Sequence, residues 1–113
     1  MITIYTLKDP ITKEVRYIGK TKRKLVDRMY SHTSNYKLSR ERSYKNSWII
    51  SLKKQNLKPI IEVLDIVEDN NWEFWEQFYI GLFKSWGFKL TNTPCNNLIY
   101  AISIFIFIFI CYH

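Results

Sequence analysis

The stretch Tyr17–His32, YIGKTKRKLVDRMYSH, concentrates side chains that could act on a polyanion. It begins with a phenol and a glycine, continues with a burst of four cations, and ends with Arg28 and His32 four residues apart. Residues at this spacing share one face of a helix, so a guanidinium and an imidazole would be presented together. A guanidinium binds phosphate through a fork of N–H groups, and an imidazole can exchange a proton near neutral pH. The stretch therefore predicts a site that binds an anion and transfers protons.

Three further candidates lie elsewhere in the chain. Tyr5 is in an early β-rich segment, Glu76 is in an aromatic-rich segment, and Asn92 is in a predicted turn. An unpaired carboxylate among aromatic side chains is costly. Glu76 therefore either has a functional partner or lies at the wet edge of its helix, and both interpretations stay open here. Taken singly, each candidate also has an ordinary explanation in packing or solvation.

The charge of the chain is uneven along its length. Residues 8–58 carry 15 Lys and Arg against 4 Asp and Glu, a net of +11, whereas the remaining residues carry 2 against 6, a net of −4. The two values give the overall charge of +7. A basic first half facing a mildly acidic second half predicts an anionic partner on one surface, although a merely solvated basic surface would have the same composition.

Periodicity predicts the elements that must position these residues. Pairing of the first hairpin about Ile11 would place Tyr5 opposite Tyr17 and Ile4 opposite Ile18. The two phenols would then lie on one face of the sheet and the two isoleucines on the other. The last strand has the near-continuous apolar run of a central position, and Gly87 should end the last helix after a cap at Asn70 or Asn71. We expect strands over residues 2–8, 15–20 and 58–67 and helices over residues 22–35, 43–56 and 72–86.

The ordered set of candidates resembles the GIY-YIG endonuclease family over roughly residues 1–94. The likeness rests on TIY (Thr3–Tyr5), YIG (Tyr17–Gly19), Arg28 with His32, Glu76 in EQFYI and Asn92 in LTN. The first motif of the family normally begins with Gly, and Thr3 takes that place here. The resemblance implies an α/β fold of the α+β type, a small three-stranded antiparallel sheet flanked by helices, which agrees with the predicted elements.

The resemblance also implies an activity, the hydrolysis of DNA phosphodiesters with one Mg²⁺ (or Mn²⁺) held by Glu76. A carboxylate completed by water and phosphate oxygens suits this hard cation. Tyr5 would be the general base or a proton relay to the attacking water, and Tyr17 would position it. A phenol has a pKa near 10, so nearby positive charge is needed for ionisation.

The remaining implied roles concern the substrate. Arg28 would bind the phosphate, His32 would orient the water or assist a proton transfer, and Asn92 would bind phosphate or hold the site together. Gly19 would allow close approach of the backbone to the substrate. The cations that would contact the DNA backbone are Lys20, Lys22, Arg23, Lys24 and those from Arg40 to Lys45.

Residues 95–113 differ in composition from the predicted nuclease domain, residues 1–94. Leu98–His113 has no charged side chain if His113 is neutral, and its apolar run is about 15 residues. That is shorter than the roughly 17–25 residues of a spanning helix. The segment could be a short membrane anchor, a last buried strand or helix, or non-native sequence read through after an interruption of the gene. The third interpretation favours a truncated catalytic domain without its own specificity domain.

Other classes of protein find little support in the sequence. Cys95 and Cys111 are far apart, which argues against a zinc site or a disulfide framework, and we find no phosphate-binding loop. The N-terminus lacks the pattern of a secretory signal, so we expect a cytoplasmic protein, and abundant Lys, Ile and Asn are typical of an AT-rich genome such as that of a phage. The alternative function is a non-catalytic basic DNA-binding module, with membrane tethering through residues 98–112 left open.

Overall fold

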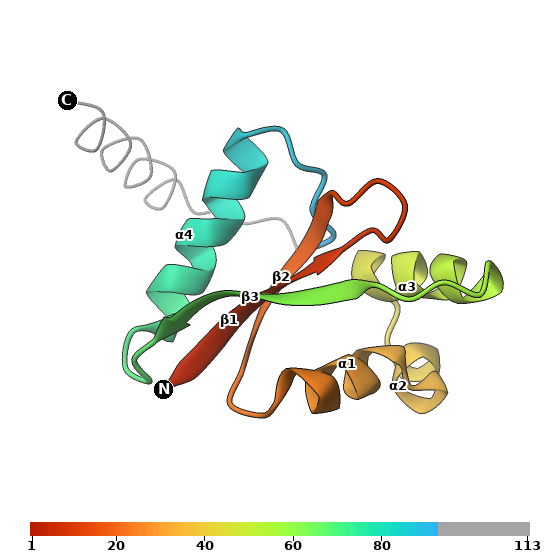
Figure 1. The fold of residues 1–113 in the computed structure, drawn as a ribbon, viewed down its shortest axis with the longest axis horizontal. Helices are drawn as coiled ribbons and strands as arrows, with labels where there is room; N and C mark the ends of the chain where they lie inside the picture. The colour runs from red at the N-terminus through yellow and green to blue at the C-terminus, as the bar shows by residue number, and fades with distance from the viewer. Residues whose placement is uncertain (93–113) are drawn as a thin grey trace.

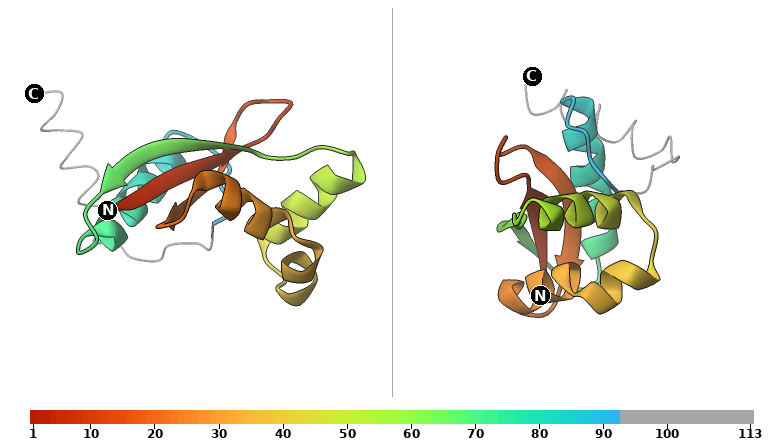
Figure 2. Two further views of the ribbon diagram at one scale, coloured as in Figure 1. Left: turned by 60° about the horizontal axis from the view of Figure 1, so that its bottom comes forward. Right: turned by 90° about the vertical axis from the view of Figure 1, so that its right-hand side faces the viewer.

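A three-stranded antiparallel sheet, in the order β2-β1-β3, forms the centre of the computed structural model, which describes residues 1–92. Helices α1, α2 and α3 lie together and apart from α4 (Figures 1 and 2). This arrangement confirms the predicted α+β fold with a small sheet flanked by helices. The elements are β1 (Ile2–Lys8), β2 (Val15–Thr21), α1 (Leu25–Thr33), α2 (Asn35–Arg40), α3 (Tyr44–Lys54), β3 (Ile60–Val67) and α4 (Trp72–Ser85).

Each face of the sheet has its own core, because successive strand residues point to opposite sides. Ile4 and Ile18 are fully buried on the face that packs against Ile80 and the aromatic side chains of α4. Tyr5 and Leu7 are fully buried on the other face, in a cluster that includes the α3 residues Trp48, Ile49 and Leu52. The predicted separation of tyrosines and isoleucines onto opposite faces is confirmed.

The register of the hairpin differs from the prediction by two residues. Tyr5 lies opposite Gly19 rather than Tyr17, and Ile4 lies opposite Lys20 rather than Ile18. A shift of two residues preserves the face of every side chain, which is why the division into faces still holds. Tyr17 therefore lies diagonally from Tyr5 on the same face, and Gly19 takes the place directly beside the phenol.

The turn between β1 and β2 explains this displacement. The Asp9 carboxylate accepts hydrogen bonds from the backbone N–H groups of Ile11 and Thr12, at 2.8 and 3.1 Å. Lys13 adopts a left-handed conformation with φ of 65°, and the ladder is irregular between Leu7 and Lys8. A simple midpoint at Ile11 ignores this irregularity, and pairing begins with Lys8 opposite Val15 instead.

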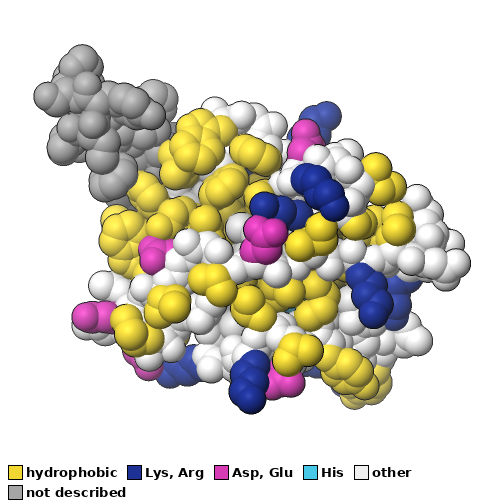
Figure 3. All heavy atoms as spheres, viewed as in Figure 1, with side chains coloured by type: hydrophobic (Ala, Val, Ile, Leu, Met, Phe, Trp, Pro, Cys, Tyr) yellow, Lys and Arg dark blue, Asp and Glu magenta, His cyan; other side chains and the backbone are white. Residues whose placement is uncertain are grey.

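Strand β3 is an edge strand, so the prediction of a central position for it was wrong. β1 is the central strand, and the side chains of Val63 and Ile66 on β3 are 54% and 55% exposed. The apolar run of β3 reflects residue types that suit a strand, not burial on both faces. The surface in Figure 3, viewed from the same side as Figure 1, shows apolar side chains with Lys/Arg and Asp/Glu interspersed among them.

The helices follow the predicted periodicity with different limits. The expected helix over residues 22–35 is shorter, because α1 ends at Thr33 and the separate helix α2 follows, which the sequence did not reveal. Asn71 is the N-cap residue of α4, but its side chain makes no capping hydrogen bond. Gly87 adopts φ of 91°, and the N–H of Phe88 bonds the carbonyl of Phe83 at 3.1 Å, a typical helix end.

Within residues 1–92, no helix is long and apolar enough to cross a membrane. The apolar segment 95–113, with Cys95, Cys111 and the three interpretations given above, lies outside the described residues, as does the domain boundary at residue 94.

Candidate active site

Tyr5, His32 and Arg28 meet on the face of the sheet covered by α1. The Tyr5 hydroxyl lies 2.5 Å from His32 Nε2, and Arg28 Nε donates a hydrogen bond to the same hydroxyl oxygen at 2.9 Å. Arginine can only donate, and Nε2 is the one acceptor that the hydrogen bonds of residues 1–92 offer the phenol proton, so we assign that proton to the bond toward Nε2. The network thus assigns a neutral His32 with its own proton on Nδ1. The predicted pairing of Arg28 and His32 on one helical face is confirmed, and Tyr5 is their common partner.

Burial keeps both partners of this hydrogen bond neutral. His32 is 3% exposed. Its pKa falls to about 3, chiefly through burial and further through the positive charges of Lys45, Arg28 and Lys37. The pKa of Tyr5 is raised, again chiefly by burial, although Arg28 acts in the opposite direction. The resting pair is therefore a protonated phenol beside an unprotonated imidazole, not a phenolate beside an imidazolium.

Tyr17 and Gly19 form the adjoining part of the site on β2. The Tyr17 ring is 6.3 Å from the Tyr5 ring and 5.5 Å from the His32 ring, measured between centroids. A Cβ on Gly19 would lie 2.5 Å from the Tyr5 hydroxyl oxygen and 2.7 Å from Tyr17 Cε1. The contact that excludes a side chain at Gly19 is thus with the two phenols. Close approach of the substrate to the Gly19 backbone stays a prediction.

Glu76 lies on α4, which packs against the other side of the sheet. Its carboxylate is half-buried, and burial raises its pKa, while Lys20 and Arg28 act to lower it. The negative charge of Glu76 in turn raises the pKa of both Tyr5 and Tyr17. Glu76 therefore interacts electrostatically with the phenols and Arg28, and its role as a metal ligand stays a prediction. It lies neither in a closed aromatic core nor at a fully wet edge.

The donor set for a metal ion is small. No group of three or more His, Cys, Asp or Glu side chains that could hold a metal occurs within residues 1–92. Glu76 would supply one carboxylate oxygen, and water and phosphate would have to supply the rest, a pattern that Mg²⁺ accepts. Burial already disfavours the charged form of Glu76, so a cation beside it would stabilise the carboxylate. The chemistry of this residue fits a hard divalent cation.

Asn92 acts on the backbone of β2. Its side-chain amide donates to the carbonyl of Ile18 at 2.7 Å and accepts from the N–H of Ile18 at 3.0 Å. These two bonds continue the ladder on the outer edge of β2, next to Tyr17 and Gly19. Of the two roles implied for Asn92, holding the site together is the one that its contacts support.

The predicted DNA-contacting cations do not all converge on Tyr5. Lys22 forms a salt bridge with Asp69 at 3.0 Å, and Arg23 Nη2 donates to the Ser31 hydroxyl at 2.9 Å. Lys24 is exposed just before α1. Lys20 lies 4.5 Å from the centre of the Trp72 ring, near Glu76. Among the hydrogen bonds and salt bridges of residues 1–92, none joins these four side chains to Tyr5, Arg28 or His32.

The sequence-based prediction counts Lys45 only among the cations that contact the DNA backbone, but Lys45 lies at the candidate site. Its ammonium is 5.3 Å from the centre of the Tyr17 ring. Together with Arg28, His32 and Lys37 it lines a pocket of about 180 Å³. The sequence contains a signal for this position, because Lys45 shares the helical spacing of Trp48, Ile49 and Leu52, which form the buried face of α3.

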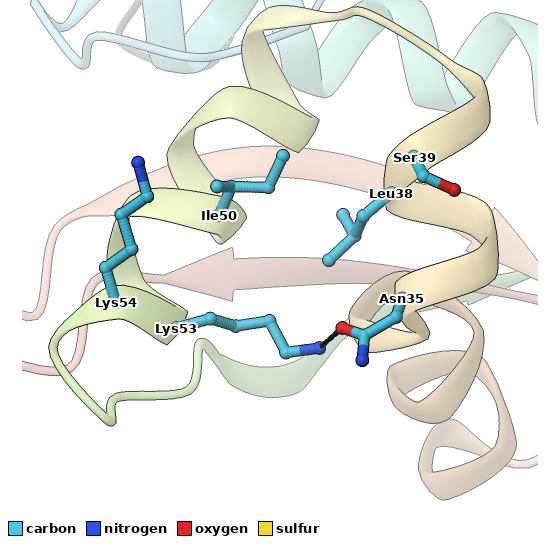
Figure 4. A pocket seen from close by; sticks show the side chains of 6 residues that line it. All are labelled: Asn35, Leu38, Ser39, Ile50, Lys53 and Lys54. Atoms are coloured by element: carbon cyan, nitrogen blue, oxygen red, sulfur yellow. Dashed lines mark hydrogen bonds between the residues drawn. The ribbon is translucent and has the colours of Figure 1, made fainter.

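A larger pocket, of about 350 Å³, lies between α2 and α3 (Figure 4). Its floor is apolar, with Leu38 and Ile50, and Lys53 donates across it to the side-chain oxygen of Asn35 at 2.6 Å. None of the candidate catalytic residues lines this pocket. Its size therefore does not make it the active site.

Comparisons of the chain with protein-family models, with curated proteins and with solved structures find no match.

Proposed function

We propose that this chain is a metal-dependent DNA endonuclease, a GIY-YIG-like catalytic domain over residues 1–94 that hydrolyses phosphodiester bonds. The observation that carries the proposal is the position of the Tyr5 hydroxyl, between the accepting Nε2 of His32 and the donating Nε of Arg28. A purely structural tyrosine needs one hydrogen-bond partner. This one has both a proton acceptor and a phosphate-binding cation.

The geometry favours Tyr5 as a proton relay. Water attacking the phosphorus would pass a proton to the Tyr5 oxygen while Tyr5 passes its own proton to His32 Nε2. The raised pKa of Tyr5 disfavours a free phenolate, and a relay avoids forming one. Because Tyr5 has no exposed surface, we expect Arg28 to move toward the phosphate on binding and to uncover the phenol.

The other residues would position the substrate and its cation. Glu76 would hold Mg²⁺ or Mn²⁺, which when bound would polarise the phosphoryl oxygen and stabilise the leaving oxyanion. Tyr17 would align the water, and Asn92 would keep Tyr17 and Gly19 in place through the Ile18 backbone. The partner would be DNA and the compartment the cytoplasm. A domain of this size would be a minimal nuclease or one that takes its sequence specificity from another domain.

Plasmid nicking by the full chain, with Mg²⁺ or with EDTA, tests the proposal. Glu76→Gln should lower the nicking rate by about 100-fold or more, a typical loss when one electrostatic stabiliser of a transition state is removed, while DNA binding survives. Glu73→Gln is the matched control, because it removes the same charge from an exposed position of the same helix.

Two results would contradict the assignment. Full nicking by Glu76→Gln would remove the proposed metal ligand from the mechanism. A folded chain that binds DNA but shows no Mg²⁺-dependent nicking would instead support the non-catalytic DNA-binding module.

A further inference from the structure

Three cations from three helices converge on the pocket beside the Tyr5–His32 pair. Arg28 comes from α1, Lys37 from α2 and Lys45 from α3, and the pocket measures about 180 Å³. Glu41 is the one carboxylate in its lining. The pocket is continuous with the candidate active site, because Arg28 and His32 belong to both.

The positive charge in this pocket is poorly compensated. Three salt bridges form within residues 1–92, and none of them involves Arg28, Lys37 or Lys45. Burial lowers the pKa of Lys45 most, and the charge of Arg28 lowers it further. Glu41 opposes this lowering, and Lys37 adds a smaller lowering of its own. Like charges held this close destabilise the folded chain unless an anion joins them.

The position of Lys45 within α3 strengthens this point. Lys45 lies in the first turn of the helix, where a positive charge opposes the helix dipole, and no acidic residue occupies that turn. Its side chain is nevertheless held in place, over the Tyr17 ring. A half-buried lysine at the unfavourable end of a helix, among other cations, is expected where an anionic ligand supplies the missing charge.

We propose that this pocket binds one phosphate of the DNA backbone, next to the phosphate that Arg28 would present to Tyr5, with Lys45 as its principal ligand. Arg28 lines this pocket and also bonds Tyr5, so its guanidinium fork, once it has moved away from the phenol, can link the two phosphates. The inference rests on the proposed function. It adds a second phosphate subsite and a residue, Lys45, that the sequence motifs do not include.

The test compares Lys45→Gln with Lys54→Gln in the full chain. Both variants remove one positive charge from α3, but Lys54 is exposed and lies outside this pocket. Binding of a short fluorescent DNA duplex is measured in EDTA over a range of salt concentrations. Lys45→Gln should weaken binding roughly tenfold at low salt and reduce the slope of log K against log salt by about 0.9. Lys54→Gln should change neither value appreciably.

Several outcomes would overturn the subsite. Equal effects of the two variants would mean that Lys45 contributes only general charge. If the slope of log K against log salt is the same for Lys45→Gln as for the wild type, Lys45 does not contact a phosphate. Inorganic phosphate that shifts the NMR signals of the pocket, while duplex binding is unchanged by Lys45→Gln, would assign the pocket to a small phosphate ligand instead of DNA.

The nuclease proposal and the subsite can fail separately. If Lys45→Gln alone weakens DNA binding but the wild-type chain never nicks DNA, the subsite stands and the nuclease assignment falls. If nicking depends on Mg²⁺ and Glu76 while Lys45→Gln binds DNA as the wild type does, the nuclease stands and the subsite falls. Thermal unfolding of both lysine variants shows that they are folded, and we expect relief of repulsion to leave Lys45→Gln at least as stable as the wild type.

Discussion

Replacing Gly19 with alanine should disturb the candidate site without removing any ionisable group. The added Cβ would lie 2.5 Å from the Tyr5 hydroxyl oxygen, 2.7 Å from Tyr5 Cζ and 2.7 Å from Tyr17 Cε1, whereas ordinary contacts begin at 3.4 Å. To restore 3.4 Å from 2.5 Å, the Tyr5 oxygen would have to retreat by about 0.9 Å. Tyr5 is fully buried and bonded to His32 and Arg28, so it has little room to do so.

The expected size of the effect follows from this overpacking. Extra methyl groups in a packed core destabilise by about 1–3 kcal/mol, and in a domain of this size each kcal/mol lowers Tm by roughly 4–8 °C. Thermal or urea unfolding measures this loss directly. If the chain is the proposed nuclease, displacement of the Tyr5 oxygen should also slow nicking more than it weakens DNA binding.

A double-mutant cycle shows whether the clash with the phenol oxygen is the cause. Tyr5→Phe deletes the atom closest to the new methyl group, so Gly19→Ala should cost less in the Tyr5→Phe background, by about 0.5 kcal/mol or more. Tyr17→Phe is the matched control, because it keeps Cε1 and should give no relief. Strict additivity with Tyr5→Phe, or equal relief from both phenylalanines, would refute this account of Gly19.

Two further predictions concern His32 and Asn92. Because the folded-state pKa of His32 is about 3 and its ordinary value is 6.5, the unfolded chain binds more protons between these values. The free energy of unfolding should have its full value above about pH 6.5. It should fall as the pH drops toward 3, by at most about 1.4 kcal/mol per pH unit. His32→Gln should flatten this dependence in urea unfolding measured at several pH values, and an unchanged slope would contradict the burial argument. Asn92→Ala removes two hydrogen bonds to the Ile18 backbone and should destabilise by about 1–3 kcal/mol; a loss no larger than that of the exposed control Asn70→Ala would contradict its bridging role.

The sequence predicted the fold well where local pattern determines structure. Period-two alternation located β1 and β2, and helical periodicity located α1, α3 and α4 apart from their exact limits. Prediction from the sequence failed where the pairing of strands determines the structure. The hairpin register depended on the left-handed Lys13 and a ladder irregularity, and neither has a signature in residue type. The edge position of β3 depended on which strand pairs with β1, and composition does not encode that choice.

In the candidate site, too, local residue spacing could be predicted from the sequence, whereas contacts that depend on strand pairing could not. The i, i+4 spacing of Arg28 and His32 predicted that they would act together, and they do share Tyr5. The direct contact between Gly19 and the phenols could not be predicted, because it follows from the displaced register. Lys45 was predicted only as a contact to the DNA backbone because it belongs to no motif, even though its helical spacing places it on the buried face of α3.

The pKa of His32 connects the proposed relay to the proposed phosphate subsite. Burial is the largest cause of its low value, and Lys45, Arg28 and Lys37 supply the rest. A bound phosphate would neutralise the charge contribution of these cations but leave the burial in place, so it would raise the pKa of His32 only in part. The imidazole would then accept the Tyr5 proton more readily with DNA in the pocket than without it. On this argument Lys45→Gln should lower the affinity for DNA while relieving some of the charge that depresses His32. The pKa of His32, followed by NMR, should therefore rise in free Lys45→Gln and stay at the wild-type value in free Lys54→Gln.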